Sequence, residues 1–304
     1  MTRIGLVGCG RWGAHILRDL RALGCEVHVA DPAEAARVAA RKGGAESCSA
    51  AARALPSVDG VVVASPASTH ASSIAELLPR AVPLFVEKPL APAAADRARL
   101  ATLPASDARR VFVMHKWRRH PAVEAIAAIA RSGELGPVRS VLTIRNQPEA
   151  THADVDALWT LAPHDVSIAL EILGCVPEPR LARAERDPAR GAVVRFHGTS
   201  GTAPFHAMEI ALGVAKRRSI VVTFRDGIAS IDGERDAEIT IVRDDGARAA
   251  PEVRSVSSEL PLLRELRDFV GFLAGGPPPK STLADGLAVD GAVAKLRSLA
   301  GLPD

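Results

Sequence analysis

Three glycines near the start of the chain, in the segment Gly8-Cys9-Gly10-Arg11-Trp12-Gly13, have the spacing of a dinucleotide-binding loop. An apolar run over residues 4–7 precedes them and a helical pattern follows, which is the order that a pyrophosphate site needs. Gly8 permits a tight turn, Gly10 lets phosphate approach the backbone, and Gly13 lets helix and strand pack closely. The N–H groups and the positive dipole end of the helix would face the phosphates. We therefore expect five residues of the segment to bind the cofactor: Gly8, Gly10, Arg11, Trp12 and Gly13.

An acid after the second predicted strand, residues 26–30, favours one of the two common dinucleotides. Asp31 lies 18 residues past Gly13, near the spacing of the acid that hydrogen-bonds the adenosine ribose. Its carboxylate would repel a 2′-phosphate, so we expect NAD rather than NADP. Arg37 or Arg41 could instead accommodate that phosphate, which leaves NADP as an alternative. An ordinary glycine turn without a nucleotide is the other alternative.

Alternating helices and strands are predicted to position these residues. Helical patterns cover residues 11–23, 33–42, 74–78 and 93–103, and apolar strands cover 26–30, 60–65, 84–86 and 110–114. Continuous apolar strands are typical of a parallel sheet covered on both faces. We therefore predict an α/β fold, with a doubly wound parallel sheet of the Rossmann type as a dinucleotide-binding domain in residues 1–118.

The pattern changes beyond residue 120. After a helix over 121–133, period-two strands are predicted at 138–146, 191–198, 206–214, 219–225 and 237–243, with turns such as 226–227 and 245–246. A mostly apolar helix ends at Gly174, and two further helices are expected at 259–274 and 282–300. These features predict a second domain, residues 119–304, of α+β type with a mostly antiparallel open sheet.

Composition excludes several classes of protein. The 38 basic and 35 acidic residues leave a net charge of +3, too small for binding nucleic acid by bulk electrostatics. The four cysteines form no C-x-x-C pair, which favours a reducing cytoplasm, and no apolar run is long enough to span a membrane. The histidines and acids show no metal-ligand spacing. Tyrosine is absent, which excludes a phenolic acid or base.

Further motifs follow the glycine segment in an order typical of one family. They are Ser68-Thr69-His70, Glu87-Lys88-Pro89, Arg119-His120-Pro121-Ala122-Val123, Gly133-Glu134-Leu135-Gly136 and Leu161-Ala162-Pro163-His164-Asp165. On these motifs the chain resembles the Gfo/Idh/MocA oxidoreductases, the glucose-fructose oxidoreductase and inositol dehydrogenase family. The last motif resembles the branch of nucleotide-sugar 3-dehydrogenases. The resemblance implies a Rossmann domain, a second domain whose open sheet often forms homodimers or homotetramers, and nicotinamide in the cleft between.

The resemblance also implies the active-site residues. Lys88 takes the place of the family's active-site lysine and His164 that of its histidine. The residues implied to line the cofactor are Ser65, Pro66, His70, Glu87 and Lys88. Lys88 directly follows a parallel strand, where its ammonium could stabilise an alkoxide. His164 and Asp165 are expected in the first turn of a helix, where the dipole would keep the imidazole neutral and favour the carboxylate.

One departure from the family pattern affects this site. Many relatives carry an aspartate four residues before the histidine, and this chain has Thr160 there. A threonine can orient a partner but supplies no charge. Either Lys88 and His164 act without that acid, or Asp154 or Asp156 replaces it.

Basic and aromatic residues are candidates for the substrate. Arg118 and Arg119 could pair with a phosphate or carboxylate, and so could Arg145, although a short charged run can also be a solvated face or a loop brace. Trp159, like Trp117, could stack on a sugar or simply lie in the core. Thr160 completes the candidate set for substrate binding.

The sequence thus predicts an NAD-dependent dehydrogenase or reductase that acts on a secondary alcohol or ketone of a sugar, nucleotide sugar or cyclitol. Two alternatives remain. One is an enzyme that retains NAD and recycles it internally in a hydrolysis, elimination or epimerisation. The other is a non-catalytic NAD-binding sensor or partner subunit.

Overall fold

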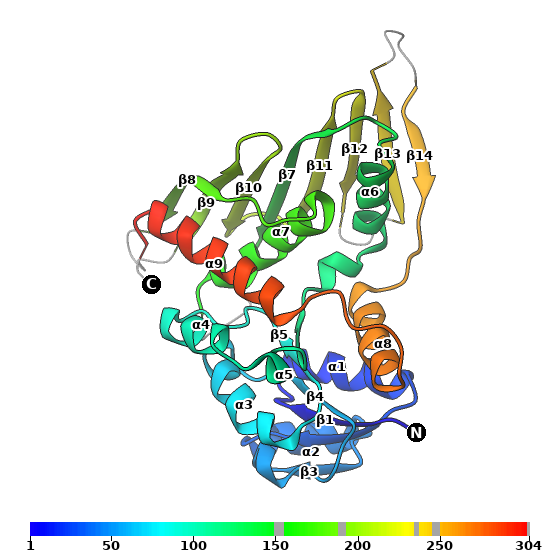
Figure 1. The fold of residues 1–304 in the computed structure, drawn as a ribbon, viewed down its shortest axis with the longest axis vertical. Coiled ribbons are helices and arrows are strands. Elements are labelled where there is room, and N and C mark those ends of the chain that lie inside the picture. Colours follow the sequence, from blue (N-terminus) through cyan, green and yellow to red (C-terminus); the bar gives the residue numbers. More distant parts are fainter. Residues whose placement is uncertain (149–154, 188–192, 234–236, 245–249, 303–304) are drawn as a thin grey trace. The chain divides into compact units, whose positions relative to one another are not determined.

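Six short strands form a parallel sheet, sheet A, in the N-terminal part of the chain (Figure 1). The structure is a computed structural model, and it describes residues 1–148, 155–187, 193–233, 237–244 and 250–302. The chain divides into two units, of which unit 1 is Met1–Lys116 with Leu262–Leu287, and unit 2 is Trp117–Pro261 with Ala288–Asp304. Each unit has a sheet of its own, and each is described separately below.

Sheet A of unit 1 has the strand order β3-β2-β1-β4-β5-β6. Every pair is parallel. The strands are β1 (Arg3–Val7), β2 (Glu26–Ala30), β3 (Ser47–Ser49), β4 (Gly60–Val63), β5 (Leu84–Glu87) and β6 (Val111–Met114). This is the strand order of a dinucleotide-binding Rossmann fold, so the predicted fold class is confirmed for this part of the chain. Only β3, three polar or small residues long, was not predicted.

Helices cover both faces of sheet A, because successive residues of each strand point to opposite sides. In β4, Val61 and Val63 belong to one apolar core and Val62 to the other. The helices are α1 (Arg11–Ala22), α2 (Glu34–Lys42), α3 (His70–Leu77), α4 (Ala94–Ala101), α5 (Ala105–Ala108) and α8 (Pro261–Leu273). Phe269 of α8 stacks on Phe85 of β5 with 5.0 Å between ring centroids.

The packing of α8 differs from the predicted domain division. The sequence places all of residues 119–304 in one domain, whereas Leu262–Leu287 belongs to unit 1. An amphipathic pattern identifies the apolar face of a helix but not the surface that covers it. Helix α8 thus completes the core of unit 1, although it comes late in the sequence. The domain boundary near residue 118 stays a prediction.

Unit 2 contains an eight-stranded sheet, sheet B, in the order β14-β13-β12-β11-β7-β10-β9-β8. Among the described strands of sheet B only β7 and β10 pair in parallel, which confirms a mostly antiparallel sheet. The strands are β7 (Val138–Gln147), β8 (Pro179–Arg186), β9 (Val193–Gly201), β10 (Phe205–Leu212), β11 (Arg217–Phe224), β12 (Gly227–Asp232), β13 (Glu238–Arg243) and β14 (Glu252–Ser255). Strands β8, β12 and β14 were not predicted, because β8 is highly charged, β12 follows the Asp226-Gly227 turn signal at once, and β14 is short. The predicted turn at 245–246 lies outside the described residues.

Three helices lie along one face of sheet B: α6 (Pro121–Ser132), α7 (Ala157–Leu173) and the unit 2 part of α9 (Leu283–Leu299) (Figure 1). In β7, Val141 and Thr143 are buried beneath these helices, while Leu142 points to the opposite face and is 38% exposed. None of the helices in the described ranges covers the far face of sheet B (Figure 1).

Helix α7 begins earlier than predicted. Its N-cap is Asp156, whose Oδ1 accepts hydrogen bonds from the N–H groups of Leu158 and Trp159 at 3.0 and 3.1 Å. Pro163 lies inside this helix rather than before it. The expectation that His164 and Asp165 occupy the first turn is therefore wrong.

No helix within the described ranges is both long and apolar enough to cross a membrane.

Candidate active site

The glycine segment forms a loop between β1 and α1 at the carboxyl edge of sheet A. Gly8 has φ +87°, and a Cβ there would lie 2.5 Å from the backbone nitrogen of Ser65. A Cβ on Gly13 would lie 2.3 Å from the carbonyl oxygen of Gly8, so neither position tolerates a side chain. A Cβ on Gly10, in contrast, would meet no atom of the described chain within 4 Å. Gly10 is the N-cap of α1 and supplies no side-chain cap, which fits a pyrophosphate at this helix end.

Asp31 follows β2 and lies beside the glycine loop. Its Oδ2 accepts a 2.7 Å hydrogen bond from the Cys9 N–H, and its Oδ1 accepts one of 2.8 Å from Ala33. The guanidinium of Arg37 donates to the carbonyl oxygens of Asp31 and Pro32, each at 2.8 Å. The loop and the carboxylate are thus held together, and an arginine lies at the same strand end.

Glu87 and Lys88, at the end of β5, lie in the same unit as this loop. The Nε1–H of Trp12 and the backbone N–H of Lys88 donate to the two carboxylate oxygens of Glu87, the second at 3.0 Å. Lys116 Nζ lies 4.7 Å from the centroid of the Trp12 ring. Burial raises the pKa of the Glu87 carboxyl above its ordinary value, although Lys88, Trp12 and Lys116 partly offset the rise. The cluster connects the start of α1 with the end of β5.

The contact of Lys116 with Trp12 was not predicted from the sequence. The basic run from Lys116 to His120 was the available signal, but only the tertiary structure brings Lys116, just past β6, to Trp12 of α1.

Both ring nitrogens of His70 contact backbone carbonyl groups of the protein. Its Nδ1 lies 2.8 Å from the carbonyl oxygen of Pro89, and its Nε2 lies 2.9 Å from that of Ser65. Thr69 Oγ1 lies within hydrogen-bond distance of Ser65 Oγ at 2.8 Å and of the Pro66 carbonyl oxygen at 2.7 Å. The buried imidazole therefore links the loop after β4 to the residue that follows Lys88.

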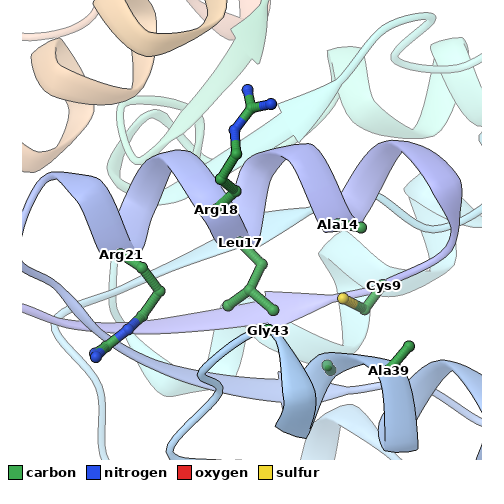
Figure 2. A pocket seen from close by; sticks show the side chains of 8 residues that line it. Cys9, Ala14, Leu17, Arg18, Arg21, Ala39 and Gly43 are labelled. Atoms are coloured by element: carbon green, nitrogen blue, oxygen red, sulfur yellow. The ribbon is translucent and has the colours of Figure 1, made fainter.

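A cavity of about 260 Å³ opens between α1 and α2 of unit 1 (Figure 2). Cys9 and Leu17 point into it, while the guanidinium groups of Arg18 and Arg21 point away from it and from each other (Figure 2). Burial, with Asp31 and Cys48 nearby, raises the pKa of the Cys9 thiol to about 11, so the thiol stays protonated near neutral pH. The lining is mostly apolar and does not include Lys88, so we assign no reaction to this cavity.

The other proposed catalytic residue, His164, is buried in α7 of unit 2. Its carbonyl oxygen accepts a 2.8 Å hydrogen bond from Ser167 Oγ. The next residue, Asp165, forms a buried ion pair with Arg145 rather than stabilising a helix end. Burial raises the pKa of the Asp165 carboxyl above its ordinary value, and Arg145 is the largest opposing influence. The dipole argument for a neutral His164 fails, because this residue lies more than two turns inside the helix.

The arginines proposed for the substrate all have carboxylate partners within unit 2. Arg118 Nε lies 3.1 Å from Glu171 Oε2, and Arg119 Nη1 lies 3.0 Å from Glu124 Oε1. These ion pairs are what we expect if the basic run braces a loop.

Trp159 and Thr160 lie near the start of α7, and both are buried. The Thr160 hydroxyl donates to the Asp156 carbonyl at 3.0 Å, and Asp156 also pairs with Arg297. Asp156 thus serves as a helix cap and ion-pair partner, while Asp154, the other acid considered, lies outside the described residues. Within the ranges that the structure describes, no group of three or more His, Cys, Asp or Glu residues could hold a metal ion.

Comparison with known proteins agrees with this geometry. Residues 2–115 match the oxidoreductase family with an NAD-binding Rossmann fold. The matching model is that of the Gfo/Idh/MocA oxidoreductases. The predicted resemblance and the predicted NAD-binding fold are therefore confirmed.

Among curated relatives, the inositol 2-dehydrogenase of Acidothermus cellulolyticus is 33% identical over 177 residues, which are 55% of this chain and 52% of that protein. The chain spans about half the length of the curated relatives that it matches.

Two solved structures show how far the fold extends. An oxidoreductase domain protein from Kribbella flavida has a TM-score of 0.85 at 22% identity and covers 100% of both chains. The UDP-N-acetylglucosamine 3-dehydrogenase GnnA from Acidithiobacillus ferrooxidans has a TM-score of 0.83 at 21% identity, covering 98% of this chain and 97% of that one. Both similarities show that this chain shares their fold over nearly its whole length.

Proposed function

We propose that this protein is an NAD-dependent dehydrogenase or reductase acting on a secondary alcohol or ketone of a sugar, nucleotide sugar or cyclitol. One observation carries the proposal: unit 1 combines an uncapped helix start beside Gly10, a carboxylate at Asp31, and Lys88 at a strand end of the same parallel sheet. Ligands of open α/β sheets bind at such carboxyl ends. The names of the inositol 2-dehydrogenase and nucleotide-sugar dehydrogenase relatives support the substrate class.

For the cofactor, we propose that the backbone around Gly10 and the start of α1 hold the pyrophosphate and that Asp31 accepts from the ribose hydroxyls. The residues proposed to contact it are Gly8, Gly10, Arg11, Trp12, Gly13, Asp31, Ser65, Pro66, Glu87 and Lys88. His70 would act on this site indirectly, since its ring already bridges two backbone carbonyls. When bound, nicotinamide would accept or supply the hydride.

Two side chains are proposed to handle charge and protons at the substrate. In oxidation, Lys88 would donate a hydrogen bond to the reacting oxygen and stabilise its developing negative charge. His164 would accept the hydroxyl proton as general base. Thr160 donates to its own helix backbone, so it supplies no charge to either group.

For the substrate we propose Arg119, whose side chain is 24% exposed, as the contact for an anionic group. Arg118, Trp159 and Thr160 would shape the same part of unit 2, whereas Arg145 is assigned a different role below.

We also propose that the chain forms a homodimer or homotetramer through the far face of sheet B, in the cytoplasm. Large apolar side chains on that face are between 38% and 68% exposed: Leu142, Leu181, Phe205, Ile228, Val242 and Val253. Exposed large apolar side chains gathered on one face of a sheet are typical of interaction sites.

The function is tested with Lys88→Ala and a control, Lys42→Ala, which changes an exposed lysine of α2. Material retained by the purified protein is identified by mass spectrometry, and NADH formation is followed with polyols, cyclitols and nucleotide sugars. We expect Lys88→Ala to lower kcat by about 10²- to 10³-fold, as for loss of one oxyanion donor, with NAD affinity unchanged. Lys42→Ala should leave both unchanged.

Three results would contradict this proposal in different ways. Unchanged turnover in Lys88→Ala removes that residue from the mechanism. Product formation without net NADH indicates internal recycling of the cofactor. Tight NAD binding with no turnover on any compound indicates a sensor or partner subunit.

A further inference from the structure

Arg145 and Asp165 form an ion pair inside unit 2. The pair is shielded from solvent, since the two side chains are 3% and 1% exposed. Arg145 Nε lies 3.1 Å from each carboxylate oxygen, and its Nη2 lies 3.0 Å from Oδ1. Such a forked contact fixes direction as well as distance. It joins β7 at the middle of sheet B to the middle of α7.

Aromatic rings fix the arginine from a second side. Its guanidinium carbon lies 4.5 Å from the centroid of the Trp117 ring. Trp117 in turn stacks on His120, with 4.8 Å between centroids and 7° between ring planes. The guanidinium is therefore held between a carboxylate and an indole. This arrangement fixes the direction from which Asp165 contacts the guanidinium.

The position of the pair along α7 gives it a consequence. Pro163 has no N–H, so the backbone hydrogen bond to the carbonyl of Trp159 is missing just before His164. Asp165 is the next residue, and its ion pair attaches the helix to the sheet directly after that interruption. Consecutive helical residues differ by about 100° around the axis, so an Asp165 directed at β7 fixes the direction of His164.

We propose that Arg145 and Asp165 are positioning residues that set the orientation of the His164 imidazole for proton transfer. The inference rests on the proposed role of His164. A buried ion pair is weak evidence for stability, since an apolar pair of similar volume is often as stable. Precise placement is a different matter, because a displacement of about 1 Å at a reacting group can cost about 10²-fold in rate.

Three variants separate placement from stability. Arg145→Met combined with Asp165→Leu replaces the pair by apolar side chains. Arg145→Lys keeps the charge but loses the planar fork, which covers the case in which the double variant does not fold. Arg254→Lys is the matched control, since Arg254 is an ion-paired arginine elsewhere in unit 2.

The readouts are Tm, NAD affinity, kcat on the compound found in the substrate screen, and NMR relaxation of the His164 ring, with His28 of unit 1 as reference. In Arg145→Lys and the double variant we expect kcat to fall about 10- to 100-fold and the His164 ring to become mobile, with NAD affinity unchanged. The double variant should keep the Tm of the parent. Arg254→Lys should change neither kcat nor the His164 ring.

The proposal is overturned if the pair variants fold with a His164 ring as rigid as in the parent. His164→Asn is measured beside them. Full turnover in His164→Asn rejects the proposed general base, whereas its loss there, with full turnover in the pair variants, rejects only the positioning role. The relaxation measurement needs no substrate, so it decides the proposal even where the screen finds none.

Discussion

Asp31 shows how much a single carboxylate can decide about the cofactor. Its two oxygens already accept from the Cys9 and Ala33 N–H groups, so its position is set before any nucleotide arrives. A carboxylate held in this way favours ribose hydroxyls over a 2′-phosphate. Arg37 donates to carbonyls at the same strand end, and it would be the partner of a phosphate if the carboxylate lost its charge.

We predict that Asp31→Asn weakens NAD binding by about 10- to 100-fold, the cost of a hydrogen bond to a charged group, and improves NADP binding. Adding Arg37→Gln should abolish the gain for NADP, whereas adding Arg41→Gln should not. Fluorescence titrations of the four proteins with both nucleotides measure this. Equal NAD affinity in the parent and Asp31→Asn would mean that Asp31 does not contact the ribose.

The prediction for Asp165 differs most clearly from the structure. The sequence placed Asp165 in the first turn of a helix, whereas it lies in the middle of α7. The cap that decides the matter is Asp156, and its bonds to two backbone N–H groups are visible only in the structure. Asp156 thus stabilises the helix start in place of Asp165, because the helix begins earlier than predicted.

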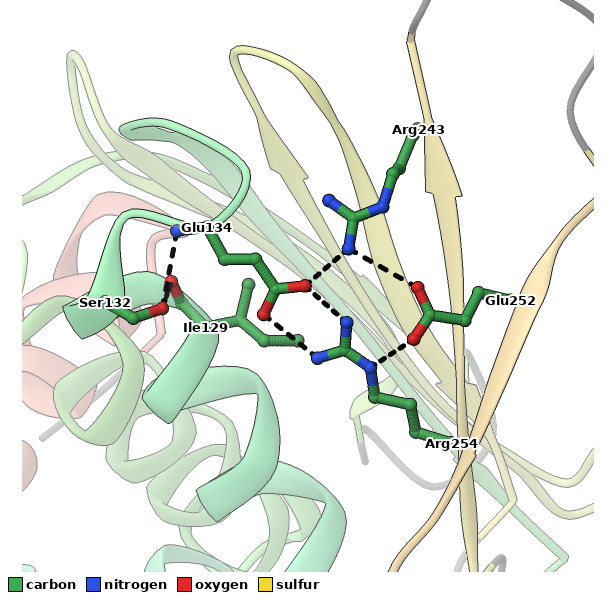
Figure 3. Close-up of polar contacts among 6 residues, drawn as sticks. All are labelled: Ile129, Ser132, Glu134, Arg243, Glu252 and Arg254. Atoms are coloured by element: carbon green, nitrogen blue, oxygen red, sulfur yellow. Dashed lines mark hydrogen bonds and ion pairs between the residues drawn. The ribbon is translucent and has the colours of Figure 1, made fainter.

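Among the elements, the edge strand β14 is attached to the rest of unit 2 by a charged cluster (Figure 3). Glu134, just past α6, pairs with Arg243 of β13 and Arg254 of β14, and both arginines also contact Glu252. The Glu134 N–H donates to Ser132 Oγ at 3.3 Å, which fixes the loop. Hydrogen bonds from Arg254 and Arg243 lower the pKa of Glu134 to about 2.

This pKa predicts how stability depends on pH. The carboxyl titrates near its ordinary value of 4.5 when unfolded and at about 2 when folded, so its stabilisation is complete above pH 4.5 and is lost as the pH falls toward 2. Glu134→Gln should lower the Tm at pH 7 by about 2–4 °C and flatten the loss of Tm between pH 5 and 3. The control is Glu238→Gln, an exposed acid of β13 for which the described part of the chain shows no ion pair. Identical acid profiles for Glu134→Gln and the parent would contradict the prediction.

For the whole molecule, the far face of sheet B carries the proposed oligomer interface. Leu142 and Ile228 lie on this face, 38% exposed each, and Ile228 is directly opposite Val242 across β12 and β13. Stable interfaces bury about 800 Å² per partner with an apolar centre, which a stripe of this kind can supply.

We predict that Leu142→Asp with Ile228→Asp converts the oligomer into a monomer without unfolding it, because two charges would be buried unpaired at the interface. Light scattering after size exclusion and a Tm measurement test this. Val38→Asp, at an exposed apolar residue of α2, is the control and should leave the assembly intact. A parent that is monomeric, or a double variant with unchanged mass, would exclude this face as the interface.

Residue chemistry and the periodicity of apolar residues were enough to predict much of the fold from the sequence alone. The glycine spacing, the apolar strands 26–30 and 60–65, and Lys88 directly after a strand predicted the Rossmann fold and its binding edge, because turn geometry and strand burial are local requirements. Tertiary structure alone decided which surfaces meet. The packing of α8 on sheet A, the contact of Lys116 with Trp12 and the pairing of Arg145 with Asp165 depend on residues distant in the chain, and no periodicity encodes which partner a face or a charge will find.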